Sequence, residues 1–327
     1  MNNGFSAAFD FRSFPMGPAL RKYLGVSDGY RGELAGKVPH EAVEAFARAL
    51  IDHASDHPLV DGSQLVDILE ELVTMDVPVA ALQLYEAHRE IFPAADFRAQ
   101  FHLGNAAMLA GSLVLAEQAF SEAQRLVPAE TAPYVNMAQL LAYDARFDEA
   151  RRWIDSGLDV DPNHFGLWEL LAWTLRQQEV PGHAKTVEQI ARQKNSWAGL
   201  SLAMDLVAPD EPERKLNVLE DFYAAGTTSE GFLVEYTAVL GQCGLYDRIP
   251  AAIWRADVAV PGKPLSWKLK LHLAQAQLAA NRFADARGSL EDLSGMDGLP
   301  PQVRDGILPA LFAELEESQA TPVRSES

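Results

Sequence analysis

The side chains best suited to chemistry stand in the segment DHASDHP, where His53 and His57 are four residues apart and each follows an aspartate. Residues four apart share one face of a helix, so both imidazoles could bind one zinc or nickel ion. However, Pro58 follows directly and ends the helix, and a histidine in the last turn is already favoured by the helix dipole. We therefore expect two histidines at a helix C-terminus and no metal.

The other chemical motifs in the sequence are incomplete. Cys243 has no evident histidine partner that would activate it as a nucleophile. The Gly-Lys pairs at 36–37 and 262–263 lack the upstream glycine of a phosphate-binding loop, and the His-Glu pair at 40–41 lacks the second histidine of a zinc protease motif. The sequence therefore predicts a protein that is not an enzyme and has no cofactor.

The composition is that of a folded protein. Of its 327 residues, 48% are hydrophobic and 22% are charged, which excludes wholesale disorder. The length exceeds that of one compact core, so we expect two domains or an elongated fold. The sequence shows neither a membrane-spanning run nor a secretory signal, and its single cysteine, Cys243, cannot form an internal disulfide, so the expected location is cytoplasmic.

The charge is distributed unevenly along the chain. Residues 1–37 carry five basic and three acidic side chains, whereas the remainder carries 22 basic and 43 acidic ones. Such an acidic body repels nucleic-acid phosphates and anionic lipid. We therefore expect protein or peptide partners, with basic ones best matched in charge, and neither nucleic-acid binding nor membrane insertion; the oligomeric state stays open.

Two nearly identical hexapeptides reveal a period in the chain. RFDEAR occupies residues 146–151 and RFADAR occupies 282–287, a separation of four times 34 residues. The same period relates Ala116, Ala150 and Ala184, and it also relates Pro128 and Pro162. Small residues allow two antiparallel helices to cross closely, and a proline marks the boundary before the next unit. Each unit is therefore predicted to be a helical hairpin, with the hexapeptide at the start of its second helix.

This pattern resembles the tetratricopeptide repeat, most clearly in units 97–130, 131–164 and 165–198. The resemblance implies an all-α fold, a right-handed α-solenoid of antiparallel helix hairpins. Residues 62–95, 230–263 and those from 267 follow the pattern less closely, and residues 196–229 suggest a degenerate hairpin. The expected organisation is a Phe-rich extension at 1–37, a helix within 38–61, repeats over 62–299 that are best at 97–198, a capping helix at 300–317 and a disordered tail at 318–327.

The resemblance also implies a binding site, because the first helices of such repeats line a concave groove that holds peptides or partner helices. The residues expected in this groove are Arg98, Phe101, Asn105, Met108, Asn136, Gln139, Tyr143, Glu169, Trp173 and Arg176. The expected function is a non-catalytic interaction module that acts as an adaptor, assembly factor or chaperone. The alternative is an accessory or regulatory subunit of an enzyme complex.

Two asparagines of this groove, Asn105 and Asn136, resemble those of the dicarboxylate clamp of chaperone-binding family members. That clamp also needs cations at three further places, where this chain has Phe101, Gly166 and Leu170. A clamp for a C-terminal carboxylate pair is therefore not expected. Two interpretations stay open: the amides hold peptide backbone, or they are ordinary solvated helix residues.

Aromatic residues raise two further expectations. Trp168 occupies the packing position of its repeat and is expected in the core, whereas Trp173 is expected to be exposed in the groove. The N-terminus concentrates Phe5, Phe9, Phe11 and Phe14 within ten residues. These rings could cover the first hairpin, fold back along the groove or form a linear motif for another protein, or the segment could be disordered.

Overall fold

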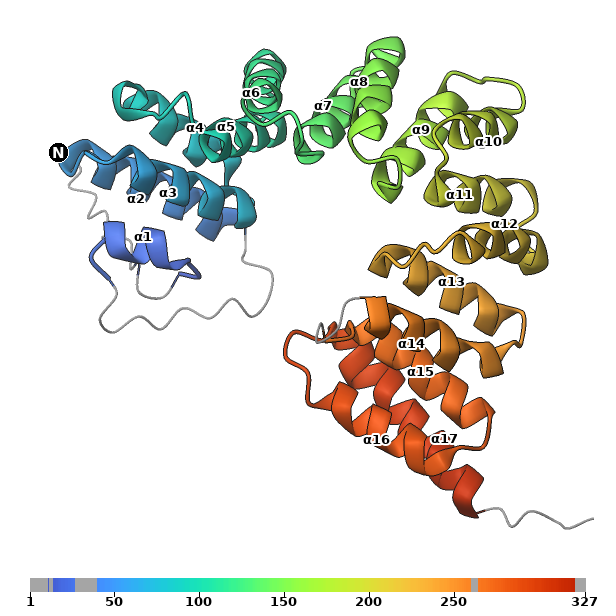
Figure 1. The fold of residues 1–327 in the computed structure, drawn as a ribbon. Coiled ribbons are helices and arrows are strands. Elements are labelled where there is room, and N and C mark those ends of the chain that lie inside the picture. The colour runs from blue at the N-terminus through green and yellow to red at the C-terminus, as the bar shows by residue number, and fades with distance from the viewer. Residues whose placement is uncertain (1–10, 12–13, 27–39, 260–263, 321–327) are drawn as a thin grey trace, which may run out of the picture. The chain divides into compact units, whose positions relative to one another are not determined.

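The computed structural model describes residue 11 and residues 14–26, 40–259 and 264–320. The described residues form helices joined by short turns, and none of them lies in a β-strand (Figure 1). The chain divides into two units, residues 1–161 with 169–179 and residues 162–168 with 180–327. Within each unit the hairpins follow one another in chain order, which confirms an all-α solenoid.

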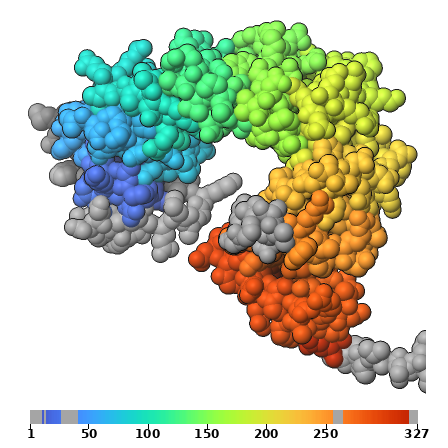
Figure 2. Space-filling view, in the orientation of Figure 1, coloured from blue at the N-terminus to red at the C-terminus, as the bar shows by residue number. Residues whose placement is uncertain are grey.

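The first unit contains the helices up to α8 and most of α9. Their bounds are α1 Pro18–Tyr23, α2 His40–Asp56, α3 Gly62–Thr74, α4 Pro78–Ala87, α5 Phe97–Leu109, α6 Leu113–Leu126, α7 Ala132–Tyr143, α8 Phe147–Val160 and α9 Phe165–Gln177. The pairs α3 with α4, α5 with α6 and α7 with α8 are helical hairpins in contact. In the space-filling view the hairpins of this unit, coloured blue to green, close up against one another in chain order (Figure 2).

Small residues allow the two helices of a hairpin to cross closely, as the sequence predicts. Ala116 and Ala150 are fully buried at successive crossings. A Cβ atom at Gly104 would lie only 2.6 Å from the ring of Phe120, which is itself fully buried. The space that a side chain at position 104 would need is therefore filled by the ring of Phe120 from the second helix of the hairpin.

The repeated hexapeptides have the same local structure. Arg146 and Arg282 are the N-cap residues of α8 and α16, and each follows a residue in the left-handed region, Ala145 or Asn281. Arg146 pairs with Glu149 at 2.8 Å and Arg282 with Asp285 at 2.7 Å. Each hexapeptide thus begins the second helix of its hairpin, in agreement with the prediction.

Consecutive repeats are also joined by a recurring hydrogen bond. The Tyr134 hydroxyl donates to the backbone carbonyl of Pro128 at 3.0 Å, and one period later the Trp168 indole N–H donates to that of Pro162 at 2.8 Å. Trp168 is fully buried, which confirms its expected place in the core. The aromatic residue at this place therefore anchors a first helix to the proline that closes the preceding unit.

The described part of the Phe-rich N-terminus packs on the start of the first unit. The Phe14 ring stacks on Phe46 of α2 at 4.3 Å, and the carboxylate of Glu71 in α3 accepts the backbone N–H groups of Ala19 and Leu20. Helix α1 packs on α3 and helix α2 packs on α4, so these two helices cover the first hairpin. For Phe14 the covering interpretation is supported, whereas Phe5 and Phe9 lie outside the described residues.

The second unit contains the remaining helices. Their bounds are α10 His183–Gln193, α11 Trp197–Val207, α12 Pro212–Ala224, α13 Glu230–Gln242, α14 Ile249–Ala259, α15 Trp267–Ala279, α16 Phe283–Ser294 and α17 Leu308–Ala320, with a 3-10 turn at Tyr246–Arg248 and a π-helical turn at Val303–Ile307. Residues 196–229, the expected degenerate hairpin, form the packed pair α11 and α12.

The C-terminal helix differs from its expected bounds. The expected cap at 300–317 is helical but contains a π-helical turn at Val303–Ile307, directly before α17, where Pro309 has no N–H for a helical hydrogen bond. Helix α17 then continues to Ala320, three residues into the expected tail, because Leu315 anchors it in the core and the following residues favour helix. Residues 321–327 lie outside the described part of the chain.

Candidate functional site

The expected groove residues belong to α5, α7 and residues 169–177 of α9, which are first helices of the first unit, and α3 is the first helix of the preceding hairpin. Helix α5 contacts both α3 and α7, and the Tyr143 ring of α7 lies 6.0 Å from that of Trp173 in α9. We call this surface the A-helix face. Its side chains that remain at least partly exposed include Asp67, Glu70, Arg98, Phe101, His102, Asn105, Met108, Asn136, Gln139, Tyr143, Glu169, Trp173 and Arg176.

The two asparagines meet each other across neighbouring repeats. The Asn136 Nδ2 group donates to Asn105 Oδ1 at 2.7 Å, and both side chains are half-buried. The pair is therefore more ordered than two separate solvated residues, because each amide fixes the orientation of the other. One hydrogen bond uses only part of the capacity of the two amides, so donors and acceptors remain for a peptide backbone.

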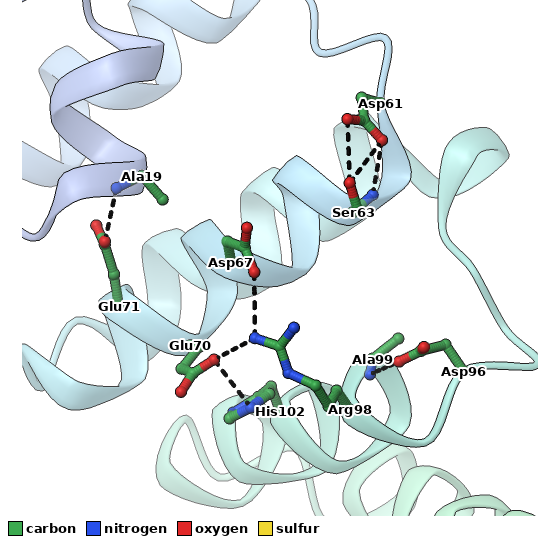
Figure 3. A network of polar contacts seen from close by, with 10 residues as sticks. All are labelled: Ala19, Asp61, Ser63, Asp67, Glu70, Glu71, Asp96, Arg98, Ala99 and His102. Carbon is green, nitrogen blue, oxygen red and sulfur yellow. Dashed lines mark hydrogen bonds and ion pairs between the residues drawn. The ribbon is translucent and has the colours of Figure 1, made fainter.

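Arg98 is less free than the sequence suggests. Its guanidinium donates to Asp67 at 3.1 Å and to Glu70 at 2.6 Å, both on α3, as Figure 3 shows. The two carboxylates outnumber the single guanidinium, and His102 Nε2 lies 3.4 Å from Glu70. Arg98 thus ties α5 to α3 instead of standing free for a ligand, and this end of the A-helix face is acidic.

Asp67 and Glu70 are site residues that the sequence interpretation missed. They are the sixth and ninth residues of unit 62–95, the same places that Asn136 and Gln139 occupy in unit 131–164. Applying the same repeat register to unit 62–95, which follows the pattern less closely, would have identified both carboxylates from the sequence.

His102 makes the stability of the first unit sensitive to acid. Its side chain is only 14% exposed, and burial holds the pKa of His102 below its ordinary value of 6.5 despite the nearby Glu70. The neutral ring therefore contributes fully to the free energy of unfolding above pH 6.5. This contribution is lost as the pH falls through the lowered pKa of His102. We expect the melting temperature to fall less between about pH 7.5 and about pH 5.5 in His102→Gln than in the wild type. An equal fall in both proteins would contradict this assignment.

The aromatic residues of the A-helix face differ in how freely they are exposed. Tyr143 is 73% exposed, whereas Phe101 and Met108 are half-buried and pack on the core cluster of Phe120 and its neighbours. Trp173 packs on the same cluster, with its ring 6.3 Å from that of Phe147. Trp173 therefore contributes to both core and surface, so its removal is expected to cost stability, which the sequence interpretation did not foresee.

The sequence of the first unit also matches a known family. Residues 76–131 match the family model of the tetratricopeptide repeat, and this segment holds α4, α5 and α6. Residues 76–131 therefore carry the sequence pattern of the tetratricopeptide repeat. Their small-residue crossings and proline boundaries are the features that the period predicted.

Several solved tetratricopeptide repeat structures resemble the chain at low sequence identity. YrrB, described as a TPR protein with an unusual peptide-binding site, is 16% identical with a TM-score of 0.35 over 61% of this chain and 99% of its own. Yeast Tom70 is 16% identical with a TM-score of 0.48 over 97% of this chain and 68% of its own. Pseudomonas aeruginosa pilF is 13% identical with a TM-score of 0.32 over 83% and 98%. No curated protein matches the chain.

The candidate metal ligands of the repeat protein do not form a site. The rings of His53 and His57 stack face to face at 4.4 Å, and Tyr23 donates to the backbone carbonyl of His57. Among the described residues, no three His, Cys, Asp or Glu side chains are grouped so that they could hold a metal ion. The stacked pair instead packs at the end of α2 against the N-terminal segment.

Cys243 is a poor candidate for a nucleophile. It is the C-cap residue of α13 and is partly exposed. Burial and the nearby Glu213 raise the pKa of its thiol, which disfavours the reactive thiolate.

As for membranes, none of the described helices combines the length and the apolar character needed to cross a bilayer.

Proposed function

We propose that this tetratricopeptide repeat protein binds a segment of another protein on the A-helix face of its first unit. The fold suggests a protein–protein interaction module, and such repeats present extended surfaces for partners. The observation that carries the proposal is the Asn105–Asn136 amide pair, with the exposed ring of Tyr143 about two helical turns further along α7. Amides can hydrogen-bond to a peptide backbone while the aromatic ring covers one of its side chains.

The charge of the face favours partners with basic segments. Asp67 and Glu70 are neutralised only in part by Arg98, and the body of the chain carries 43 acidic against 22 basic side chains. Adaptor, assembly factor and chaperone are the roles that such binding would serve. Affinity purification with mass spectrometry distinguishes them from the accessory-subunit alternative, because a single stoichiometric enzyme partner supports the latter and several unrelated clients support a chaperone.

Tyr143 offers the cleanest test of the proposed face. Because this side chain is 73% exposed, Tyr143→Ala should leave the melting temperature unchanged while weakening the captured partner's binding by about tenfold or more. Trp173→Ala should lower both the melting temperature and the affinity for the partner, since Trp173 also packs on the core. The quantities to compare are the dissociation constant and the melting temperature of each variant.

A matched control comes from the second helix of a neighbouring hairpin. Val114 of α6 is 71% exposed and apolar, and it does not belong to the A-helix face. Val114→Ala is expected to bind the partner as the wild type does. Equal affinity of Tyr143→Ala and the wild type would refute this face as the binding surface.

A further inference from the structure

The second unit contains a cavity of its own on the side of its first helices. Its volume is about 480 Å³, within the range of small-ligand pockets, and its walls come from α13, the turn at Tyr246–Arg248, α15 and α17. Ala238, Gly241 and Ala279 leave room in it, and Leu278 and Leu311 supply apolar surface. All of these lining residues belong to the second unit, whereas the A-helix face belongs to the first.

Two of the residues that line the cavity, Thr237 and His272, are hydrogen-bonded to each other. The Thr237 hydroxyl lies 2.7 Å from the Leu233 carbonyl, which can only accept, and 2.8 Å from Nδ1 of His272. The hydroxyl has one proton to donate, and the neutral His272 ring can donate or accept at Nδ1 according to its tautomer. Burial lowers the pKa of His272 below its ordinary value of 6.5, so the ring is neutral at pH 7.

The other polar groups of the cavity are also acceptors or can accept. Among the described residues that line the cavity, Glu314 carries a formal charge and none is a lysine or an arginine. Gln242 and Gln275 add two amide oxygens, and Tyr246 adds an aromatic ring that is partly exposed. The described lining therefore presents one negative charge, several acceptors and a ring face.

We propose that this cavity receives an arginine side chain of a protein partner, an inference that extends the proposed interaction function to a second site. A guanidinium group is planar and carries five N–H donors, so it can bond to a carboxylate and to amide oxygens at once. It also stacks on aromatic rings and is more weakly hydrated than the ammonium group of lysine. Arginine thus meets all three features of the lining, whereas lysine meets only the charge.

The test uses the full chain and three small probes followed by NMR chemical shifts. The probes are the N-acetyl methylamides of arginine, of citrulline, which has nearly the same shape without the charge, and of lysine. We expect arginine to shift signals of Gln242, Gln275 and Tyr246 and to bind about tenfold more tightly than citrulline, with lysine between them. Equal affinities for arginine and citrulline, or shifts confined to other residues, would overturn the proposal.

Two variants locate the effect, and one provides a control. Glu314→Gln removes the charge from an exposed residue and should reduce arginine binding to the level of citrulline, whereas Glu316→Gln on the same helix should have no effect. Ala238→Leu should block the cavity without changing any charge. Unchanged arginine binding in both Glu314→Gln and Ala238→Leu would refute the site. The probes need no partner protein, so this test is independent of the Tyr143→Ala test. A negative result here would refute the arginine site without refuting the proposed function.

Discussion

Trp168→Ala is expected to lower the free energy of unfolding by about 3–5 kcal/mol, the cost of truncating a large buried aromatic side chain. The indole is fully buried and packs so closely on α11 that a Cβ atom at Gly199 would lie 2.6 Å from it. Its N–H also donates to the Pro162 carbonyl, which loses that partner in the variant. Chemical denaturation of wild type and variant measures the difference.

A second variant separates the two contributions of Trp168. Trp168→Phe keeps an aromatic ring but has no N–H, so the hydrogen bond to Pro162 is lost while much of the packing stays. Its cost should be smaller than that of the alanine variant, with about 1 kcal/mol from the hydrogen bond itself. A Trp168→Ala protein within about 0.5 kcal/mol of the wild type would behave as a surface variant and contradict the packing described here.

Gly104→Ala is expected to destabilise the first unit, although alanine favours helix over glycine by about 1 kcal/mol. The new Cβ would lie 2.6 Å from the ring of Phe120, which is fully buried and cannot move away freely. Overpacking of this kind typically costs about 1–3 kcal/mol and should outweigh the gain in helix propensity. The change in unfolding free energy should therefore be unfavourable.

The chain offers a matched control for this substitution. Gly288 also lies inside a helix, α16, but a Cβ atom there would meet nothing within 4 Å. Gly288→Ala should therefore stabilise the protein by about 0.5–1 kcal/mol through helix propensity alone. If both substitutions shifted stability in the same direction, the close crossing of α5 and α6 would not be the reason for Gly104.

The period of the sequence was sufficient to predict the hairpins, because each one must repeat the same crossing and the same boundary. Ala116, Ala150 and Pro162 could be recognised for that reason, and the structure gives each the expected place. The packing of α1 and α2 on the first hairpin could not be recognised in this way. Its contacts, such as the Glu71 carboxylate on the N–H groups of Ala19 and Leu20, join residues about fifty positions apart that follow no repeat.

The helices that carry the candidate site residues were predictable, whereas the interactions of those side chains were not. The register placed Asn105, Arg98 and Trp173 on the first helices, but whether a side chain is free depends on its neighbour in the next repeat. Arg98 is held by two carboxylates of α3, and Asn105 is held by Asn136. Likewise, Thr237 and His272 line the cavity of the second unit together although they are 35 residues apart in the sequence.

Photo-crosslinking tests the central claim, that the A-helix face of the first unit binds another polypeptide. A benzophenone amino acid is placed at position 143 in one protein and at position 114 in another, since both native side chains are more than 70% exposed but only Tyr143 belongs to this face. We predict that position 143 crosslinks to a defined partner protein and that position 114 does not. Crosslinking to the same partner from position 114 alone would contradict the claim, as would the absence of any crosslink from position 143 in a complex that still forms.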